Sequence, residues 1–309
     1  MTKEILIISS MFLFAALAVA WQIIRTAQHV TYITLADGRR QERSLPLLIR
    51  LVLPFVGVIP TALTEHSSLE DSRSRIRKKL IAGGFEGLIE PAEVIALRIM
   101  MPLGLGVVFC VLLGFSFGSM PTGIGTMLAE RKYLIYMLIL LLLGLYPDVW
   151  LKKSVQNRHK SIERALPFVL DLLTLSVESG LDFMSGINRI IQFRAIDPLG
   201  EELIRVFREI QVGRSRKVAL QNMAERIDHM DIRSVTNALV QADELGTGIG
   251  TALRIQSDQI RVKRFQRAEK LGNEAPVKML FPLVAFIFPS VFLILLGPVI
   301  LQMALRGGF

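Results

Sequence analysis

The most constraining feature of this chain is an uninterrupted apolar run near its C-terminus that follows a long charged region. No charged residue occurs from Leu280 to Met303, a stretch of 24 positions. At the rise of an α-helix, such a stretch is long enough to cross a hydrocarbon layer about 30 Å thick. The chain is therefore predicted to carry a large water-facing domain and then to enter a bilayer.

Three other apolar runs have the length of membrane-spanning helices. They cover residues 5–24, 99–120 and 133–151. The chain has 309 residues, is 51% hydrophobic and has a mean hydropathy of +0.47, so it is more apolar than a soluble domain of this size. We predict an N-terminal transmembrane helix at 1–24, a transmembrane hairpin at 95–151 and a C-terminal transmembrane helix at 277–305.

Two features of the N-terminal third leave alternatives open. An Ala-Val-Ala sequence ending at Ala20 resembles a signal-peptide cleavage site, but the apolar run continues to Ile24, which favours a retained helix. Within the cytoplasmic or interfacial segment 25–94, the apolar run 45–63 contains Arg50 and three prolines. These residues favour an element lying in the membrane interface, and a span is the alternative.

The distribution of basic residues predicts the orientation. Lys and Arg number ten in 25–94 and twenty in 151–276, but only two in the short loop 119–132. Since positively charged loops stay on the cytoplasmic side, both large segments are expected in the cytoplasm. We predict a multi-pass protein of the bacterial inner membrane.

Residues 152–276 are predicted to form a helical bundle, because apolar residues recur there at helical spacing. The positions are Ile162, Leu166, Val169, Leu170, Leu173 and Val177, then Leu199, Leu203, Val206, Phe207 and Ile210, then Leu220, Met223, Ala224 and Ile227. Pro198 fits a first helical turn, Ser215 and Asp231 fit N-caps, and Gly213 fits a helix end. With about six helices and no strand pattern, the fold class is all-α, a polytopic membrane protein with a cytoplasmic six-helix bundle.

The bundle contains a weak internal repeat with an offset of 66 residues. The repeat aligns Glu178 with Glu244 and Gly180 with Gly246, so a helix, Glu-x-Gly and another helix occur twice. Glycine supplies the left-handed cap, whereas a carboxylate late in a helix opposes the macrodipole. A basic side chain, the next helix's N-terminus or another protein is expected to offset this effect. A solvated glutamate beside the cap is the alternative.

Searches for catalytic chemistry give no candidate. No phosphate-binding Gly-x4-Gly-Lys-Ser/Thr sequence occurs, and the glycines at 246–250 follow a helical segment instead of a strand. The four histidines are far apart in the sequence without ligand spacing and are expected at the surface. We therefore expect no catalytic residue, no metal, no cofactor, no bound nucleic acid and no enzymatic activity.

The apolar runs contain a few informative residues. Arg98 and Asp148 fall at segment ends, where interfacial hydration is sufficient, and a proton relay is the lesser alternative. Gly106 belongs to a glycine-rich face suited to helix contact. Pro282 and Pro289 lie seven residues apart, which predicts a bend on one face of the last span.

Two stretches of the bundle resemble a known family. Residues 166–191 (LPFVLDLLTLSVESGLDFMSGINRII) and 242–253 (ADELGTGIGTAL) resemble the type II secretion F domain, the cytoplasmic helical module of inner-membrane platforms in type II secretion and type IV pilus machines. The tail 274–298 (EAPVKMLFPLVAFIFPSVFLILLGP) resembles the TadC-type platform proteins of the tight-adherence (Flp) pilus system. The resemblance covers about 160–303, with one F domain where related platforms carry two.

The resemblance implies a function and a set of partners. A platform protein would couple a hexameric, TadA-like secretion ATPase to the extrusion of pilin subunits, beside a second, TadB-like platform protein. The expected partner-binding residues are Glu178, Gly180, Glu244 and Gly246, with the basic stripe Arg261, Lys263, Arg264 and Arg267. That stripe is alternatively a lipid-headgroup contact. The alternative function is a permease subunit of a transporter.

Overall fold

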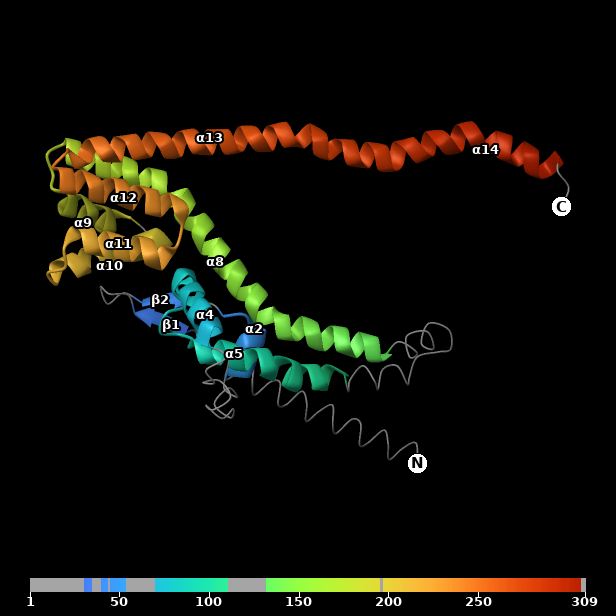
Figure 1. Cartoon of the computed structure of the whole chain (residues 1–309), viewed down its shortest axis with the longest axis horizontal. Helices are drawn as coiled ribbons and strands as arrows, with labels where there is room; N and C mark the ends of the chain where they lie inside the picture. Colours follow the sequence, from blue (N-terminus) through green and yellow to red (C-terminus); the bar gives the residue numbers. More distant parts are fainter. Residues whose placement is uncertain are drawn as a thin grey trace, which may run out of the picture.

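The computed structural model describes residues 31–34, 40–43, 45–53, 70–110, 132–194 and 197–306. Helices dominate these residues, which confirms the predicted all-α class. Figure 1 shows a bundle at one end of the molecule and two arms that leave it on the same side. Three helices are long and apolar enough to cross a membrane: Pro91–Cys110, Tyr133–Glu178 and Ile249–Met303. The predicted helix at 1–24 lies outside the described residues.

The bundle helices follow one another with short connections. They are α8 (Lys132–Glu178), α9 (Phe183–Phe193), α10 (Pro198–Gln211), α11 (Arg216–Ile227), α12 (Met230–Leu245) and α13 (Ile249–Pro282). The other elements are β1 (Thr31–Thr34), β2 (Arg40–Arg43), α2 (Leu47–Val52), α4 (Glu70–Gly83), α5 (Pro91–Met100), the π-helices η3 (Met101–Gly106) and η4 (Leu283–Ile287), and α14 (Phe288–Arg306). The short antiparallel hairpin β1–β2, which the sequence did not predict, is the one departure from helix among the described elements.

The predicted apolar positions form the core of the bundle. Residues of all six helices contribute buried side chains to one cluster, in which Ile162, Ile187 and Leu253 are fully buried. Polar side chains cap the helices: Asp197 accepts a hydrogen bond from Gly200 N at 2.8 Å, and Ser215 accepts one from Val218 N at 3.3 Å. The predicted six-helix packing therefore follows from helical periodicity and local capping.

One predicted cap is wrong. Asp231 lies in the first turn of α12, and His229 is the N-cap residue, whose Nδ1 accepts from Asp231 N at 3.3 Å. The helix begins earlier because its carboxylate is needed elsewhere: Asp231 forms an ion pair with Lys263 of α13. An acidic side chain in the first turn also favours the positive end of the helix dipole.

Helix α8 joins the bundle to the hairpin without a break. It has 47 residues and contains Pro147 and Pro167, so the boundary predicted at 151/152 falls inside a continuous helix. Proline removes a backbone donor and bends a helix, and Figure 1 shows that α8 changes direction along its length. At the other end of the bundle, α13, η4 and α14 also continue without interruption into the second arm.

The N-terminal segment builds a second core against the middle of α8. Ile76 and Leu80 of α4 are buried with Leu151, and the rings of Phe85 and Trp150 lie 5.0 Å apart. The charged run 70–80, predicted as a surface helix, thus has one apolar face that packs and one charged face that does not. In the described part of the run 45–63, α2 packs against α5.

The hairpin of α5, η3 and α8 is held by an ion pair and by small residues. Arg98 of α5 pairs with Asp148 of α8, so these residues meet instead of facing solvent separately. A Cβ added at Gly144 would lie 3.7 Å from the Arg98 carbonyl oxygen, and one at Gly106 would collide with Leu140. The close approach predicted for the glycine-rich face is confirmed at Gly106, whereas residues 114–118 lie outside the described residues.

Both π-helical segments accompany prolines. Pro102 lies in η3, and η4 begins directly after Pro282. A proline lacks the N–H that would close an i→i−4 bond, and a wider turn accommodates the missing bond. The bend predicted near Pro282 and Pro289 is therefore realised as a π-helical turn in an otherwise continuous helix.

We expect the substitution Ile187→Ala to lower the free energy of unfolding by about 2–5 kcal/mol, because it empties space in the bundle core. Ile187 is 0% exposed, whereas Ile255 is 50% exposed. Ile255→Ala is therefore the control, with an expected loss below about 1 kcal/mol. Denaturant unfolding of the full chain in detergent, followed by circular dichroism, measures both. Similar losses for the two variants would contradict this core.

Candidate functional site

The candidate site is the end of the bundle farthest from the two arms, hereafter the distal end. It consists of the three turns that join α8 to α9, α10 to α11 and α12 to α13 (Figure 1). Each turn contains a glycine with positive φ: 88° at Gly180, 97° at Gly213 and 65° at Gly246. Only glycine adopts this conformation without strain, so the three helices end at the same level.

The two glycines predicted from the internal repeat occupy equivalent positions. Leu181 N donates to Ser176 O at 3.1 Å, and Thr247 N donates to Ala242 O at 3.0 Å. Both bonds close a turn of six residues around the left-handed glycine, as in a Schellman motif. The repeat therefore describes a common geometry for the C-termini of α8 and α12.

Ion pairs connect the three turns. Asp182 pairs with Arg216 at 2.9 Å, and Glu244 pairs with Lys217 at 2.6 Å. Glu178 pairs with Arg254 at 3.3 Å. Of the predicted ways to offset a carboxylate at a helix C-terminus, the structure thus shows a basic side chain at both Glu178 and Glu244. These pairs are solvent-exposed and contribute little to stability.

Apolar side chains are exposed among these charges. Val212 is 86% exposed and Leu245 is 76% exposed, while Leu181 and Val218 are partly exposed. Each belongs to a turn or first turn of the distal end. Exposed apolar residues ringed by charged groups are typical of protein–protein contact surfaces. The distal end therefore has the composition of a docking surface.

The predicted basic stripe lies elsewhere, along α13, and is engaged within the chain. Arg261 pairs with Asp171 at 2.7 Å, and Arg264 donates to the Glu163 carbonyl oxygen at 2.9 Å. Lys263 pairs with Asp231, and Arg267 pairs with the carboxylates of Glu163 and Asp231. The stripe thus fastens α13 to α8 and α12.

A buried charge network was missed by the sequence analysis. Arg158 of α8 contacts Glu201 at 2.7 Å and Glu202 at 3.2 Å, and its side chain is only 4% exposed. Glu202 also pairs with Arg226 at 2.9 Å, and Arg226 pairs with Glu209 at 2.6 Å. The available signal was position: Arg158 precedes Ile162 and Leu166 at intervals of four, on the buried face of the helix.

The charge network shifts the pKa of one carboxyl group. Burial raises the pKa of Glu209, but hydrogen bonds from Asn222 and Arg226 and the charge of Arg226 outweigh burial and hold the pKa below its usual value. Because the folded state has the lower pKa, Glu209 stabilises the fold above its unfolded pKa. That contribution is lost as the pH falls through the folded pKa.

Two histidines expected at the surface meet inside the bundle. His159 and His229 are half-buried, with ring centroids 5.3 Å apart, and His159 Nε2 lies 2.7 Å from the Ile227 carbonyl oxygen. Sequence distance concealed this contact. Within the residues that the structure describes, no group of three or more His, Cys, Asp or Glu side chains is arranged to hold a metal.

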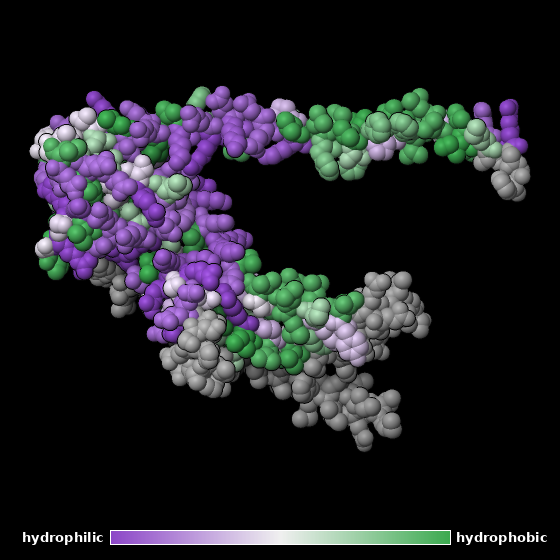
Figure 2. Space-filling model, in the orientation of Figure 1, coloured by the Kyte–Doolittle hydropathy of each residue, from purple (hydrophilic) through white to green (hydrophobic). Residues whose placement is uncertain are grey.

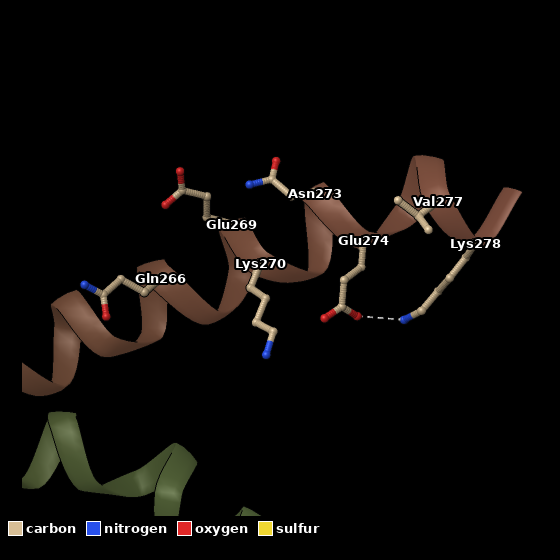
Figure 3. Close-up of a pocket in the computed structure, with 7 residues that line it drawn as sticks. All are labelled: Gln266, Glu269, Lys270, Asn273, Glu274, Val277 and Lys278. Atoms are coloured by element: carbon tan, nitrogen blue, oxygen red, sulfur yellow. Dashed lines mark hydrogen bonds and ion pairs between the residues drawn. The ribbon is translucent and has the colours of Figure 1, made fainter. Parts of the chain in front are cut away.

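A surface hollow lies along α13 between the bundle and the apolar arm. Figure 3 shows that its residues extend from one helix, with the Glu274–Lys278 ion pair at 3.0 Å. The lining consists of Gln266, Glu269, Lys270, Asn273, Glu274, Val277 and Lys278. Since the described chain provides only this one wall, the hollow does not enclose a small molecule.

Comparison with known proteins identifies one domain. Residues 169–297 match the family described as type II secretion system (T2SS), protein F. The match begins within α8 and ends within α14, so the chain carries this domain and the match includes most of the bundle and of the second arm. No curated protein and no solved structure matches the chain.

We expect Arg158→Met to lower the free energy of unfolding by about 3–5 kcal/mol, since it leaves Glu201 and Glu202 buried without this cation. The matched control is Arg254→Met, which removes an arginine whose side chain is 67% exposed. Its expected effect is below about 1 kcal/mol. Thermal unfolding of both full-length variants at neutral pH would reveal the difference, and a weak effect of Arg158→Met would refute the buried network.

The pKa of Glu209 predicts how stability changes with pH. Glu209→Gln is expected to destabilise the chain at pH 7, and the difference from the unmodified chain should shrink as the pH falls below about 4. The exposed Glu225 supplies the control Glu225→Gln, whose difference should stay small throughout. Urea unfolding at a series of pH values measures both, and a Glu209→Gln effect that is constant with pH would contradict the assignment.

Proposed function

We propose that this chain is an inner-membrane platform protein of a type IV pilus assembly machine of the tight-adherence (Flp) type. The observation that carries the proposal is the F domain match, which falls on a bundle whose first and last helices continue into candidate membrane spans. Proteins with this domain belong to platforms related to type II secretion and type IV pili. The resemblance of residues 274–298 to TadC-type tails supports the narrower assignment.

The proposed action is mechanical coupling. A hexameric, TadA-like secretion ATPase would act on the bundle, and the chain itself would hydrolyse nothing. Helix α13 leaves the bundle and continues through η4 into α14 without a break. A continuous helix transmits displacement and rotation along its axis, so movement of the bundle would reach pilin subunits at the membrane.

The distal end is the proposed ATPase contact. It contains Glu178, Gly180, Glu244 and Gly246, and it is the part of the bundle most remote from the arms (Figure 1). The basic stripe Arg261, Lys263, Arg264 and Arg267 stays a secondary proposal. A partner or lipid headgroup there would have to exchange with the existing ion pairs of the stripe.

The location and the remaining partner are also proposals. The twenty basic residues in 151–276 support a cytoplasmic bundle in the bacterial inner membrane. The single F domain supports pairing with a second, TadB-like platform protein, since related platforms carry two such domains.

The test compares two exposed apolar residues at opposite ends of α12. Leu245 lies at the distal end and is 76% exposed, whereas Met230 begins the helix and is 84% exposed. We expect Leu245→Asp to reduce capture of the co-expressed secretion ATPase by the tagged full chain at least tenfold, because a charge enters the contact surface. Met230→Asp should leave capture unchanged. Quantitative co-purification from membranes, with correct insertion checked for each variant, measures both.

Two results would overturn the proposal. Equal capture by both variants would remove the distal end as the contact. If the unmodified chain captured no secretion ATPase and no second platform protein, and instead purified with a transport ATPase, the permease alternative would replace the platform.

A further inference from the structure

The two arms leave an open space between them, hereafter the notch. Figure 2 shows this opening between the α13–α14 arm and the α8 arm, with hydrophilic residues near the bundle and hydrophobic residues farther out on both sides. The α14 arm contributes no buried residue to the rest of the chain. The notch therefore begins in water and continues to membrane depth.

Helix α8 presents one continuous face to the notch. Inside the bundle, Glu163 and Asp171 on this face contact α13. At helical spacing, the same face continues toward the hairpin through Lys160, Gln156 and Lys153. The opposite face packs on α4, where Leu151 is fully buried.

The water-facing part of this wall is cationic. Lys152, Lys153 and Lys160 are exposed, and within the described residues none of them forms an ion pair. No carboxylate occurs in the sequence from residue 149 to 162. This distinguishes the α8 wall from the basic stripe of α13, whose cations are paired with α8 and α12.

The same face becomes apolar directly below the lysines. Val149 is 60% exposed, Leu145 50%, Leu142 58% and Leu138 55%, at intervals of three or four residues. The face thus has exposed alkyl side chains at membrane depth and unpaired ammonium groups where the membrane ends. This order of chemistry matches an amphiphile with an anionic head and hydrocarbon chains.

We propose that the notch binds anionic phospholipid, with the phosphates at Lys152, Lys153 and Lys160 and the acyl chains along Leu138–Val149. A second copy of the chain is the weaker occupant, because its own α8 wall would bring lysines against lysines. The proposal rests on the membrane insertion contained in the proposed function. It does not depend on the ATPase, the pilin or the orientation of the bundle.

The test measures cardiolipin retained by the full chain in nanodiscs of phosphatidylcholine that contain a minor fraction of cardiolipin, by native mass spectrometry. The unmodified chain should retain cardiolipin in preference to phosphatidylcholine. The triple variant Lys152→Gln, Lys153→Gln and Lys160→Gln should bind it roughly a hundredfold more weakly, at about fivefold for each cation near an anionic surface. Raising the salt concentration should weaken binding to the unmodified chain.

The matched control changes net charge equally at the distal end. Arg216→Gln, Lys217→Gln and Arg254→Gln remove three cations that lie in exposed ion pairs. This variant should keep its cardiolipin. Inorganic phosphate at millimolar concentration should not displace the lipid, and displacement would show that a free anion is the ligand.

Several results would overturn the proposal. Equal loss by the two triple variants would show attraction by net charge alone, and equal retention of both lipids would remove the headgroup preference. Notch variants that keep cardiolipin but lose a dimer would assign the surface to a second copy. ATPase capture separates the two hypotheses: lost capture with retained lipid contradicts only the proposed function, and the reverse contradicts only the lipid site.

Discussion

The antiparallel packing of α8 on α13 is the interaction on which the rest of the structure depends. These two helices are the first and the last of the bundle, and each also forms part of an arm. Gly250 allows close approach at the distal end, where an added Cβ would lie 3.4 Å from Val177. Asp171 holds the middle through Ser257 and Arg261. Any change of angle between α8 and α13 would therefore alter the separation of the arms.

The buried charges act on specificity more than on stability. Arg158 and Arg226 each join α10 to another helix through Glu202. Taking such charges out of water is costly, and buried ion pairs often contribute less than apolar packing would. Their geometry, however, is satisfied in only one arrangement of helices. An all-apolar bundle of six helices with similar stripes has competing arrangements, which this network disfavours.

Sequence reasoning predicted what depends on local pattern. Helical periodicity located the bundle core, and the Glu-x-Gly repeat located two of the three glycine turns at the distal end. It failed where partners are distant in sequence: the contacts of Arg98 with Asp148, of His159 with His229 and of Arg158 with Glu201 join different helices. It also divided α8 at residue 151, because a composition change resembles a boundary even where the backbone continues through Pro147 and Pro167. Pairing across helices is a property of the packed fold.

The bare segment of α13 works as a spacer. Ile260 is the last buried residue of the chain described, and the charge-free run begins about twenty residues later at Leu280. At about 1.5 Å per residue, the spacer holds the bundle about 30 Å from the lipid. A helical spacer also links distance to direction, since each residue turns the axis by about 100°. Relatives whose spacers differ by anything other than whole turns would point their bundles toward different neighbours.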